Sequence, residues 1–350
     1  MKSLVIKISA GVLAVATTAF AVFYHGHTYG RDWEHDETHH WKKATCGHDE
    51  ISSYEEHSLG NDGFCWICER PLSPTTGVDY AISENGEMAK VTRFFGGIDQ
   101  TRVNIASEYE GVPVTEIGVG AFESLDTVTT VVLPSTIKNL SERAFWCCSA
   151  LSKVELKGEI TSIGMLAFGS CERLKEFEIP STVTEIGEFA FANCNSLDSV
   201  TIPDGVRVIN RGTFTGCVGL TSVTFGNSVT EIGESAFAHC SKLANVKLPN
   251  GVEKIGYGAF NSCIKLKTVV LPKSLTMIKE FAFSSTFELC LFYESTAEDW
   301  AKVEKLNENM PKTYFYSESE PALNEDRTGY DGDYWRYVDG VPTIWKYKNK

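Results

Sequence analysis

The chain has 350 residues, with 46 acidic and 32 basic side chains and a formal net charge of -14 at pH 7. A chain of this length exceeds one ordinary globular core, so we expect several cores or an array of repeats. Hydrophobic residues make up 43% of the chain, which argues against disorder throughout. An acidic surface repels phosphate and no basic run offsets it, so we expect no nucleic-acid partner.

Residues 1–24 have the pattern of an export signal. Two lysines, Lys2 and Lys7, precede an uncharged stretch from Ile8 to Tyr24. Ala19-Phe20-Ala21 then supplies the small-x-small pattern that a signal peptidase accepts. Because this stretch is at the short edge of what spans a bilayer, the segment is either a signal peptide or an uncleaved N-terminal anchor. We expect a secreted or cell-surface protein, with membrane contact only if this segment is retained.

Residues 25–77 form a Cys/His-rich module and linker. Seven of the eight histidines lie before residue 58, and three cysteines accompany them. A Cys-x-x-Cys pair spans one tight turn and lets two thiolates face one cation, and a further Cys with a His would complete a tetrahedral structural zinc site. The block is too small for a substantial core, so a metal would help it fold. The candidate zinc ligands are Cys46, His48, His57, Cys65 and Cys68.

Two other interpretations of this module stay open. Cys65 and Cys68 could instead form a redox-active or structural disulfide, which export favours, with Cys46 left free. The segment could also be a polar linker. A catalytic zinc has less support, because no general base stands with the candidate ligands at a recognisable spacing. We therefore expect a structural zinc at most, and no other cofactor.

Residues 78–116 predict an N-terminal cap. Tyr80 to Phe95 has the pattern of two strands around Glu84-Asn85-Gly86. Val103-Asn104-Ile105 has the strand signature of the later coils, but extra residues separate it from the next apolar position. An irregular first coil is what the exposed end of a repeat array requires.

A 23-residue period organises the segment 117–290. A large apolar residue recurs at this spacing eight times, a phenylalanine follows each one five positions later, and six cysteines form a third series. This register predicts a solenoid of stacked coils. The series are Ile117, Leu140, Ile163, Ile186, Ile209, Ile232, Ile255 and Ile278; Phe122, Phe145, Phe168, Phe191, Phe214, Phe237, Phe260 and Phe283; and Cys148, Cys171, Cys194, Cys217, Cys240 and Cys263.

The coil from Leu174 to Leu197 shows how one unit is built. Apolar and polar residues alternate from Phe177, which predicts a strand with one buried face, and Pro180 ends that strand because it lacks an N–H. Phe191 then fills the interior, and Cys194 closes the coil. The repeat pattern places a Cys or an Asn at this inward position, so we interpret the cysteine series as small core side chains.

The recurring pattern Leu-x-x-Val-x-Ile-Pro-x-x-Val-x-x-Ile-Gly-x-x-Ala-Phe-x-x-Cys resembles the BspA-type leucine-rich repeat of bacterial and protozoan surface proteins. Residues 197–217, apart from Asn210 and Thr213, and residues 243–263 match it well. The resemblance covers residues 78–290. It implies a repeat solenoid of the leucine-rich repeat class, a β-rich α/β right-handed coil that is curved and carries a parallel sheet on its concave side. It also implies adhesion to host or neighbouring-cell components.

Residues 291–350 predict a mixed α+β C-terminal cap. Ser295-x-x-Glu298 has the form of a capping box, and Trp300, Val303 and Leu306 suggest one face of a helix. Further on, Asp339-Gly340 lies between two apolar runs, which is the strongest short signal for a β-hairpin.

The concave face of a solenoid is where a binding surface is expected. The repeat register gives its outward strand positions, which are short and polar and contain no aromatic anchor. That composition is typical of a solvated sheet as well as of a binding surface, because binding hot spots favour Trp, Tyr and Arg. The candidate binding residues are Lys153, Glu155, Glu176, Glu178, Ser199, Thr201, Ser222, Thr224, Asn245 and Lys247.

Together these features predict an extracytoplasmic binding scaffold and not an enzyme. No Ser/His/Asp or Cys/His arrangement stands at a spacing that would support nucleophilic catalysis. The expected partner is a protein or another cell-surface macromolecule. Two alternatives stay open: a metal-dependent or redox activity in residues 25–77, and a purely structural spacer in the envelope.

Overall fold

The computed structural model of the chain describes residues 75–97, 99–306 and 310–347, together with the backbone of three short strands nearer the N-terminus. Those strands are β1 (Glu34–His35), β2 (His39–Lys43) and β3 (Ile51–Glu56), and they form an antiparallel sheet. The chain divides into two compact units, Met1–His57 and Ser58–Lys350, and all the repeats lie in the second unit.

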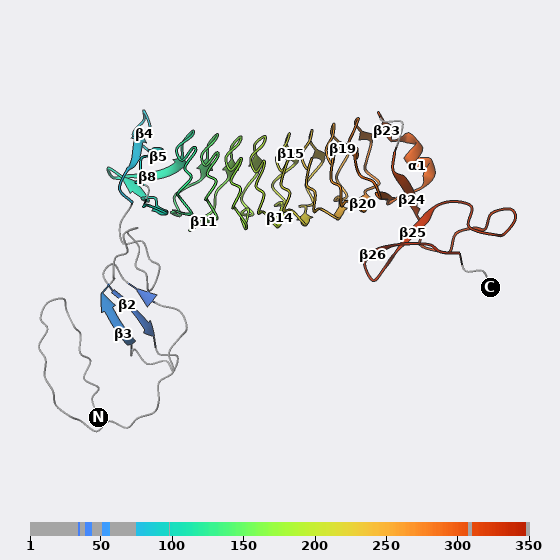
Figure 1. The fold of residues 1–350 in the computed structure, drawn as a ribbon, viewed down its shortest axis with the longest axis horizontal. Coiled ribbons are helices and arrows are strands. Elements are labelled where there is room, and N and C mark those ends of the chain that lie inside the picture. Colours follow the sequence, from blue (N-terminus) through green and yellow to red (C-terminus); the bar gives the residue numbers. More distant parts are fainter. Residues whose placement is uncertain are drawn as a thin grey trace, which may run out of the picture. The chain divides into compact units, whose positions relative to one another are not determined.

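Most coils of the second unit contribute two short strands, which pair in parallel with the equivalent strands of a neighbouring coil (Figure 1). The register advances by one repeat from coil to coil: Thr130 pairs with Lys153, and Leu140 pairs with Ile163. The predicted solenoid is therefore confirmed. Figure 1 shows the coils side by side in a nearly straight row, without the curvature that the resemblance implied. The face predicted to be concave corresponds to the outer face of the first strands.

The strands of the solenoid form two series. The first strands of successive coils are β6 (Arg102–Asn104), β9 (Thr130–Leu133), β11 (Lys153–Leu156), β14 (Ser199–Thr201), β16 (Ser222–Thr224), β18 (Asn245–Lys247), β20 (Thr268–Leu271), β22 (Cys290–Tyr293) and β24 (Lys312–Tyr316). The second strands are β8 (Val112–Ile117), β10 (Asn139–Leu140), β12 (Ser162–Ile163), β13 (Glu185–Ile186), β15 (Val208–Ile209), β17 (Glu231–Ile232), β19 (Lys254–Ile255), β21 (Met277–Ile278) and β23 (Glu304–Lys305).

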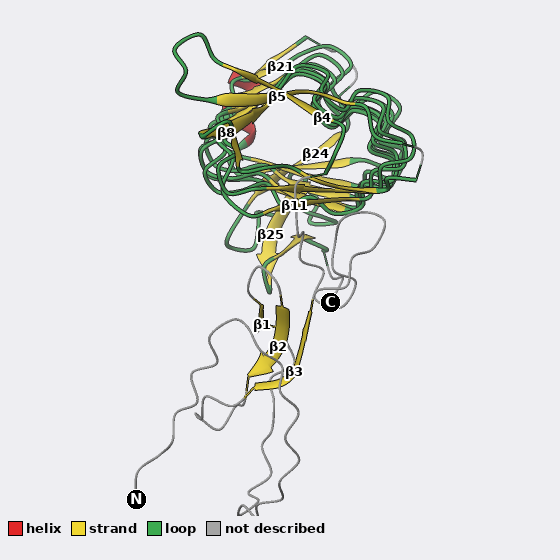
Figure 2. Ribbon diagram, turned by 90° about the vertical axis from the view of Figure 1, so that its left-hand side faces the viewer, coloured by secondary structure: helices red, strands yellow, loops and turns green. Residues whose placement is uncertain are grey.

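The core runs as a continuous column through the coils, enclosed by the two strand series and the turns (Figure 2). The predicted phenylalanine series stacks along it with ring centroids 5.1 to 5.7 Å apart from Phe122 to Phe283. Seven of these eight rings are at most 1% exposed, and Phe283, in the last coil, is 6% exposed. Offset stacking of buried rings adds to the hydrophobic stabilisation that each coil gains from its neighbours.

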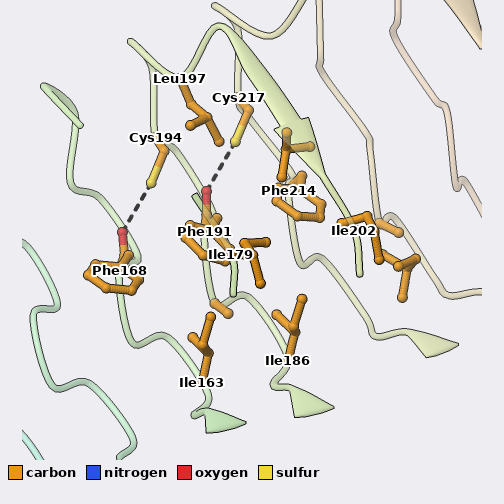
Figure 3. Close-up of a cluster of buried hydrophobic side chains, with 14 of the residues drawn as sticks. Ile163, Phe168, Ile179, Ile186, Phe191, Cys194, Leu197, Ile202, Phe214 and Cys217 are labelled. Atoms are coloured by element: carbon orange, nitrogen blue, oxygen red, sulfur yellow. Dashed lines mark hydrogen bonds between the residues drawn. The ribbon is translucent and has the colours of Figure 1, made fainter. Parts of the chain in front are cut away.

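The cysteine series lies inside this column, as predicted. Every member is at most 1% exposed, and each thiol donates a hydrogen bond to the carbonyl of a phenylalanine in the preceding coil. Figure 3 shows two of these bonds, from Cys194 to the Phe168 carbonyl and from Cys217 to the Phe191 carbonyl. All six cysteines are free thiols. A hydrogen-bonded thiol fills this position without leaving a buried polar group unpaired.

A tight corner follows each second strand from β8 to β21 and contains two residues in the left-handed backbone region. One of the two positions is held by Leu166 and Phe189 as well as by Gly212, all with φ between 56° and 58°. A residue with a Cβ adopts this backbone conformation only at a cost in free energy, so interactions with neighbouring residues must stabilise the corner. Those interactions are three backbone hydrogen bonds from each corner to the next, such as Phe191 N–H to the Thr213 carbonyl at 2.9 Å.

We expect Ser170→Gly to raise the free energy of unfolding by about 1 kcal/mol, because Ser170 has a φ of 59° and glycine reaches that region without strain. Urea denaturation of the two proteins measures the change. Ser196→Gly is the matched control, since Ser196 lies in an exposed turn outside the left-handed region. A Ser170→Gly protein less stable than its parent would show that the corner does not strain a side chain.

The N-terminal cap is built from β4 (Val78–Ile82), β5 (Ala89–Phe94) and β7 (Glu108–Tyr109). Strands β4 and β5 pair antiparallel around Gly86, which confirms the predicted strand pair, and β5 joins β8 of the first coil. The Phe94 ring stacks on Phe122 at 5.5 Å and so begins the aromatic column.

The C-terminal cap holds α1 (Ala297–Lys302), β25 (Tyr334–Val338) and β26 (Val341–Ile344). The hairpin β25–β26 turns at Asp339 and Gly340, both with positive φ, as predicted. The predicted capping box is wrong by one position: the Thr296 hydroxyl accepts from the Asp299 N–H, and the Ser295 hydroxyl donates to the Asp299 carboxylate at 2.6 Å. Within the described residues α1 is the only helix.

Candidate binding face

The ten predicted binding residues lie on first strands or in the extended segment 175–179, at positions that alternate with core side chains. The inward neighbours Val200 and Val246 are 4% and 3% exposed. Glu155 is half-buried, and the other nine are exposed. The exposed members are Lys153, Glu176, Glu178, Ser199, Thr201, Ser222, Thr224, Asn245 and Lys247. The structure therefore brings the predicted residues together on one face.

Parallel pairing arranges these side chains in two columns along the stack. Ser199 lies beside Ser222 and Thr201 lies beside Thr224. In the same column as Thr201, Lys247 lies beside Val270 of the next coil. Strands that pair in a sheet lie about 4.8 Å apart, so neighbours in one column are close enough to contact the same partner residue.

At the N-terminal end of this face, Glu155 neutralises the nearby cations. Its carboxylate lies 3.2 Å from the Arg102 guanidinium, 3.0 Å from the Lys153 ammonium and 3.3 Å from the Lys157 ammonium. Partial burial would raise the pKa of Glu155, but the hydrogen bonds from Lys153 and Lys157 and the charge of Arg102 outweigh it, so the pKa lies below its usual value. These charges already have partners within the chain.

Along the middle coils, where the first strands end and the following turns begin, a groove of about 800 Å³ crosses four coils. Its half-buried apolar lining is Val154, Leu156 and Phe225, and its acidic lining is Glu159, Glu178 and Asp204. All three acids are exposed, and none of them forms a salt bridge with another described residue. This is the part of the face with both apolar surface and uncompensated charge.

Two large residues coincide with breaks in the parallel ladder at this groove. Residues 175–179 form no strand, and their inward residue is Phe177 where neighbouring coils have Val154 and Val200. The Phe177 ring packs between Phe168 and Phe191, with centroids 4.8 and 5.6 Å away. The ladder breaks again between β16 and β18, next to Phe225. We attribute both breaks to the extra volume of a phenylalanine ring at a position that otherwise holds Val, Ile or Leu.

At the C-terminal end the same face is covered by the hairpin β25–β26. Val270, Phe292, Tyr314 and Trp335 form a second buried cluster, separate from the solenoid core. Phe292 and Tyr314 follow Val270 in register, so the column that begins with Glu155 becomes aromatic in the last coils. The indole N–H of Trp335, which is fully buried, donates to the Tyr293 carbonyl at 3.0 Å.

A polar contact ties the hairpin to the predicted binding residue Lys247. The Lys247 ammonium donates to the Tyr337 hydroxyl at 2.8 Å, and that hydroxyl donates to the Glu294 carboxylate at 2.6 Å. Burial, together with the Glu294 charge, raises the pKa of Tyr337 well above its usual value. Lys247 is therefore engaged within the chain, and the part of the face left open to a partner lies between Glu155 and Lys247.

This aromatic cluster was not predicted from the sequence. The signal was present, because Leu291, Phe292 and Tyr293 are consecutive apolar residues and a strand with both faces apolar must be covered on both sides. The same holds for Tyr314 to Tyr316.

The candidate zinc ligands Cys46, His48, His57, Cys65 and Cys68 lie outside the described residues. In the part of the chain that the structure describes, no group of three or more His, Cys, Asp or Glu side chains is placed to hold a metal ion. Among the same residues, no helix has the length and apolar character needed to cross a membrane.

Comparison with known proteins identifies the repeat. The model of the BspA type leucine rich repeat region, with six copies, matches residues 94–217 and 184–297. A leucine-rich repeat protein from Bacteroides ovatus is 25% identical, with a TM-score of 0.59 and coverage of 69% of each chain. A leucine rich cell surface protein from Faecalibacterium prausnitzii is 20% identical, with a TM-score of 0.44 and coverage of 68% of this chain and 98% of that one. No curated protein matches.

The family match spans more than half of the chain and coincides with the coils that the structure describes. The Bacteroides ovatus protein has the same kind of repeat fold. This chain belongs to the BspA-type leucine-rich repeat family.

Proposed function

We propose that this protein is an extracytoplasmic scaffold that binds a protein partner on the outer face of its first strands. One observation carries the proposal. The open part of that face, between Glu155 and Lys247, combines a groove of about 800 Å³, apolar lining and three carboxylates without a basic partner among the described residues. Apolar contacts supply affinity at protein interfaces, and complementary charges supply specificity and faster association.

The location of the site follows from the charges at its two ends. Arg102, Lys153 and Lys157 converge on Glu155, and Lys247 is held by Tyr337 and Glu294. The uncompensated acids lie between these two clusters. A partner that offers basic and apolar side chains would therefore dock on the middle coils and not at the ends.

A charge-reversal experiment tests this proposal. We expect Glu159→Lys/Glu178→Lys to lower the retention of solubilised cell-surface proteins by the immobilised full chain roughly tenfold, because the substitutions reverse the charge of two of the three acids that line the groove. The matched control is Glu185→Lys/Glu253→Lys, which makes the same change in net charge at exposed positions on or beside the second strands. Retained proteins are quantified by mass spectrometry. Equal retention by the two variants would contradict the proposal, and retention of nothing by the parent protein would favour a structural spacer.

We also propose that Cys46, Cys65 and Cys68, with His48 or His57, hold one structural zinc ion. The support is the Cys-x-x-Cys spacing, since tetrahedral zinc sites use such pairs. We expect elemental analysis of the purified chain to give one zinc per molecule and Cys65→Ser/Cys68→Ser to give none. A zinc-free protein in which Cys65 and Cys68 are oxidised would favour the disulfide instead.

Export is part of the proposal and has its own test. The support is the apolar segment and the Ala-x-Ala pattern within residues 1–24. Cell fractionation followed by N-terminal sequencing of the mature protein distinguishes cleavage after residue 21 from a retained anchor. Recovery of the unprocessed chain in the cytoplasm would contradict export.

A further inference from the structure

The hydrogen-bond ladder of the corners ends abruptly at the last coil. In each regular corner, three alternate N–H groups donate to carbonyls of the following corner. The last such set runs from Gly258, Phe260 and Ser262 to the carbonyls of residues 280, 282 and 284, at 3.0, 2.8 and 2.8 Å. The equivalent donors of the next corner are the N–H groups of Phe281, Phe283 and Ser285. Within residues 75–97, 99–306 and 310–347, these three have no hydrogen-bond acceptor.

The reason is that the final coil is too short to repeat the corner. In a regular coil the chain runs from the second-strand residue Ile255 to Thr268 before the next first strand begins. In the final coil the corresponding run, from Lys305 to Lys312, is only about half as long. The interval between β23 and β24 is therefore too short for a corner of the regular length.

A groove of about 690 Å³ lies beside this last described corner. It is lined on one side by residues 278–290 and on the other by Met310, Pro311 and Lys312. Two large apolar side chains stand at its edge: Phe281 is 48% exposed and Phe287 is 84% exposed. An edge with unpaired backbone donors beside exposed apolar side chains is a template for pairing with another chain.

We propose that this open corner, residues 281–287, is a docking edge for an extended segment of a partner protein. The segment would offer backbone carbonyls on alternate residues to the N–H groups of Phe281, Phe283 and Ser285. It would also pack a large apolar side chain against Phe281 and Phe287. This is the corner equivalent of strand addition at a sheet edge, in which backbone bonds supply affinity and side chains supply selectivity.

A second copy of the chain fits the edge less well. Head-to-tail stacking would bring the first corner of one copy, residues 119–123, onto the last corner of the other. The middle carbonyl of that first corner, at Ala121, already accepts from the Phe94 N–H at 2.9 Å. The N-terminal cap thus occupies the surface that such stacking would need.

Amide-resolved hydrogen exchange of the full chain tests the proposal, because the donors themselves report on occupancy. The probe is a synthetic peptide with the sequence of the chain's own regular corner, residues 187–193. In the free protein we expect fast exchange at Phe281, Phe283 and Ser285, and slow exchange at Phe260 and Ser262. Saturating peptide should slow the first group roughly tenfold or more and leave the second unchanged.

Two variants make the test specific. Phe281→Glu/Phe287→Glu places carboxylates where the partner's carbonyls must approach, so the peptide should no longer protect the three amides. Ile264→Glu changes the exposed residue at the Phe287 position one coil earlier, where the ladder is complete, and should leave peptide binding intact. Slow exchange at Phe260 and Ser262 shows that each variant is folded.

Three results would overturn the proposal. Protection of the three amides in the free protein at every concentration would show that the chain covers its own edge. Protection that rises with protein concentration in the absence of peptide would assign the edge to a second copy. Peptide protection that persists in Phe281→Glu/Phe287→Glu would place the peptide elsewhere.

Discussion

Raising the pH from 8 to 10 should lower the free energy of unfolding by several kcal/mol, because six buried thiols ionise only in the unfolded chain. Burial raises the pKa of Cys148, Cys217 and Cys263 to about 12, and it raises those of the other three well above the usual 9.0. Below pH 9 all six are protonated in both states and the full stability is present. Above pH 9 the unfolded chain releases protons that the folded chain keeps, and the folded thiols of Cys148, Cys217 and Cys263 ionise only near pH 12.

The size of the effect follows from proton linkage. Each thiol contributes about 1.4 kcal/mol per pH unit between the two pKa values, so six together remove about 8 kcal/mol by pH 10. A loss of that size approaches the whole stability of many domains. Urea denaturation at pH 8, 9 and 10, followed by tryptophan fluorescence, measures it. Cys217→Ala removes one thiol and should reduce the pH slope by about one sixth.

Thiol labelling gives an independent check of the same claim. Native protein treated with iodoacetamide at pH 8 should keep all six thiols of the series unmodified, since the thiolate is the reactive form and none of the six is exposed. Cys147 and Cys290, which are half-buried, should react first among the described cysteines. Stability that is equal at pH 8 and pH 10, or ready labelling of Cys194, would contradict a buried cysteine series.

Phe214→Ala should lower the free energy of unfolding by about 3–5 kcal/mol, the usual cost of removing a buried phenylalanine. Phe214 is fully buried and stacks on Phe191 at 5.4 Å and on Phe237 at 5.3 Å. Its removal therefore weakens the interfaces on both sides of one coil, and these interfaces hold a solenoid together. Thermal and urea denaturation measure the loss.

Two controls separate this effect from a general sensitivity to phenylalanine loss. Phe287→Ala should change stability by less than about 0.5 kcal/mol, because Phe287 is 84% exposed. Phe283→Ala should cost less than Phe214→Ala, because Phe283 stacks on only one member of the series, Phe260. If the variants at 214 and 283 lost the same stability, the coils would not depend on both neighbours as a stacked array requires.

The repeat core was predictable in detail because its cause is local and periodic. An apolar side chain at a fixed position of the repeating unit has to face the interior of every coil, so Ile163, Phe168 and Cys171 were assigned to the core from spacing alone. All three are fully buried. The outward positions follow from the same register, which is why residues such as Thr201 and Thr224 were correctly grouped on one face.

The corners could not be predicted because their conformation opposes the preference of the residues. Leu166, Phe189 and Phe281 adopt positive φ although each carries a Cβ. The three hydrogen bonds that link each regular corner to the next impose this backbone, and they depend on the neighbouring coil and not on the local sequence. Local propensity gives no indication of such a position.

The sequence predicts the hairpin β25–β26 itself but not its position on the outer face of the first strands. Asp339 and Gly340 identify the turn, whereas the pairing of Phe315 with Tyr334 joins strands separated by a long irregular loop. No period fixes such a connection. The open corner, by contrast, could have been found from the sequence once the strands were known, since the short interval between Lys305 and Lys312 is visible there.

Site-specific photo-cross-linking tests most directly whether the outer face of the first strands is the binding surface. A photoreactive residue is placed at Thr201 in one full-length protein and at Lys254, an exposed position on a second strand, in another. Both are exposed to the same cell-surface preparation. We expect a discrete adduct with one protein from position 201 and none from position 254. Adducts of equal yield from both positions, or from position 254 alone, would contradict a binding surface on the first strands.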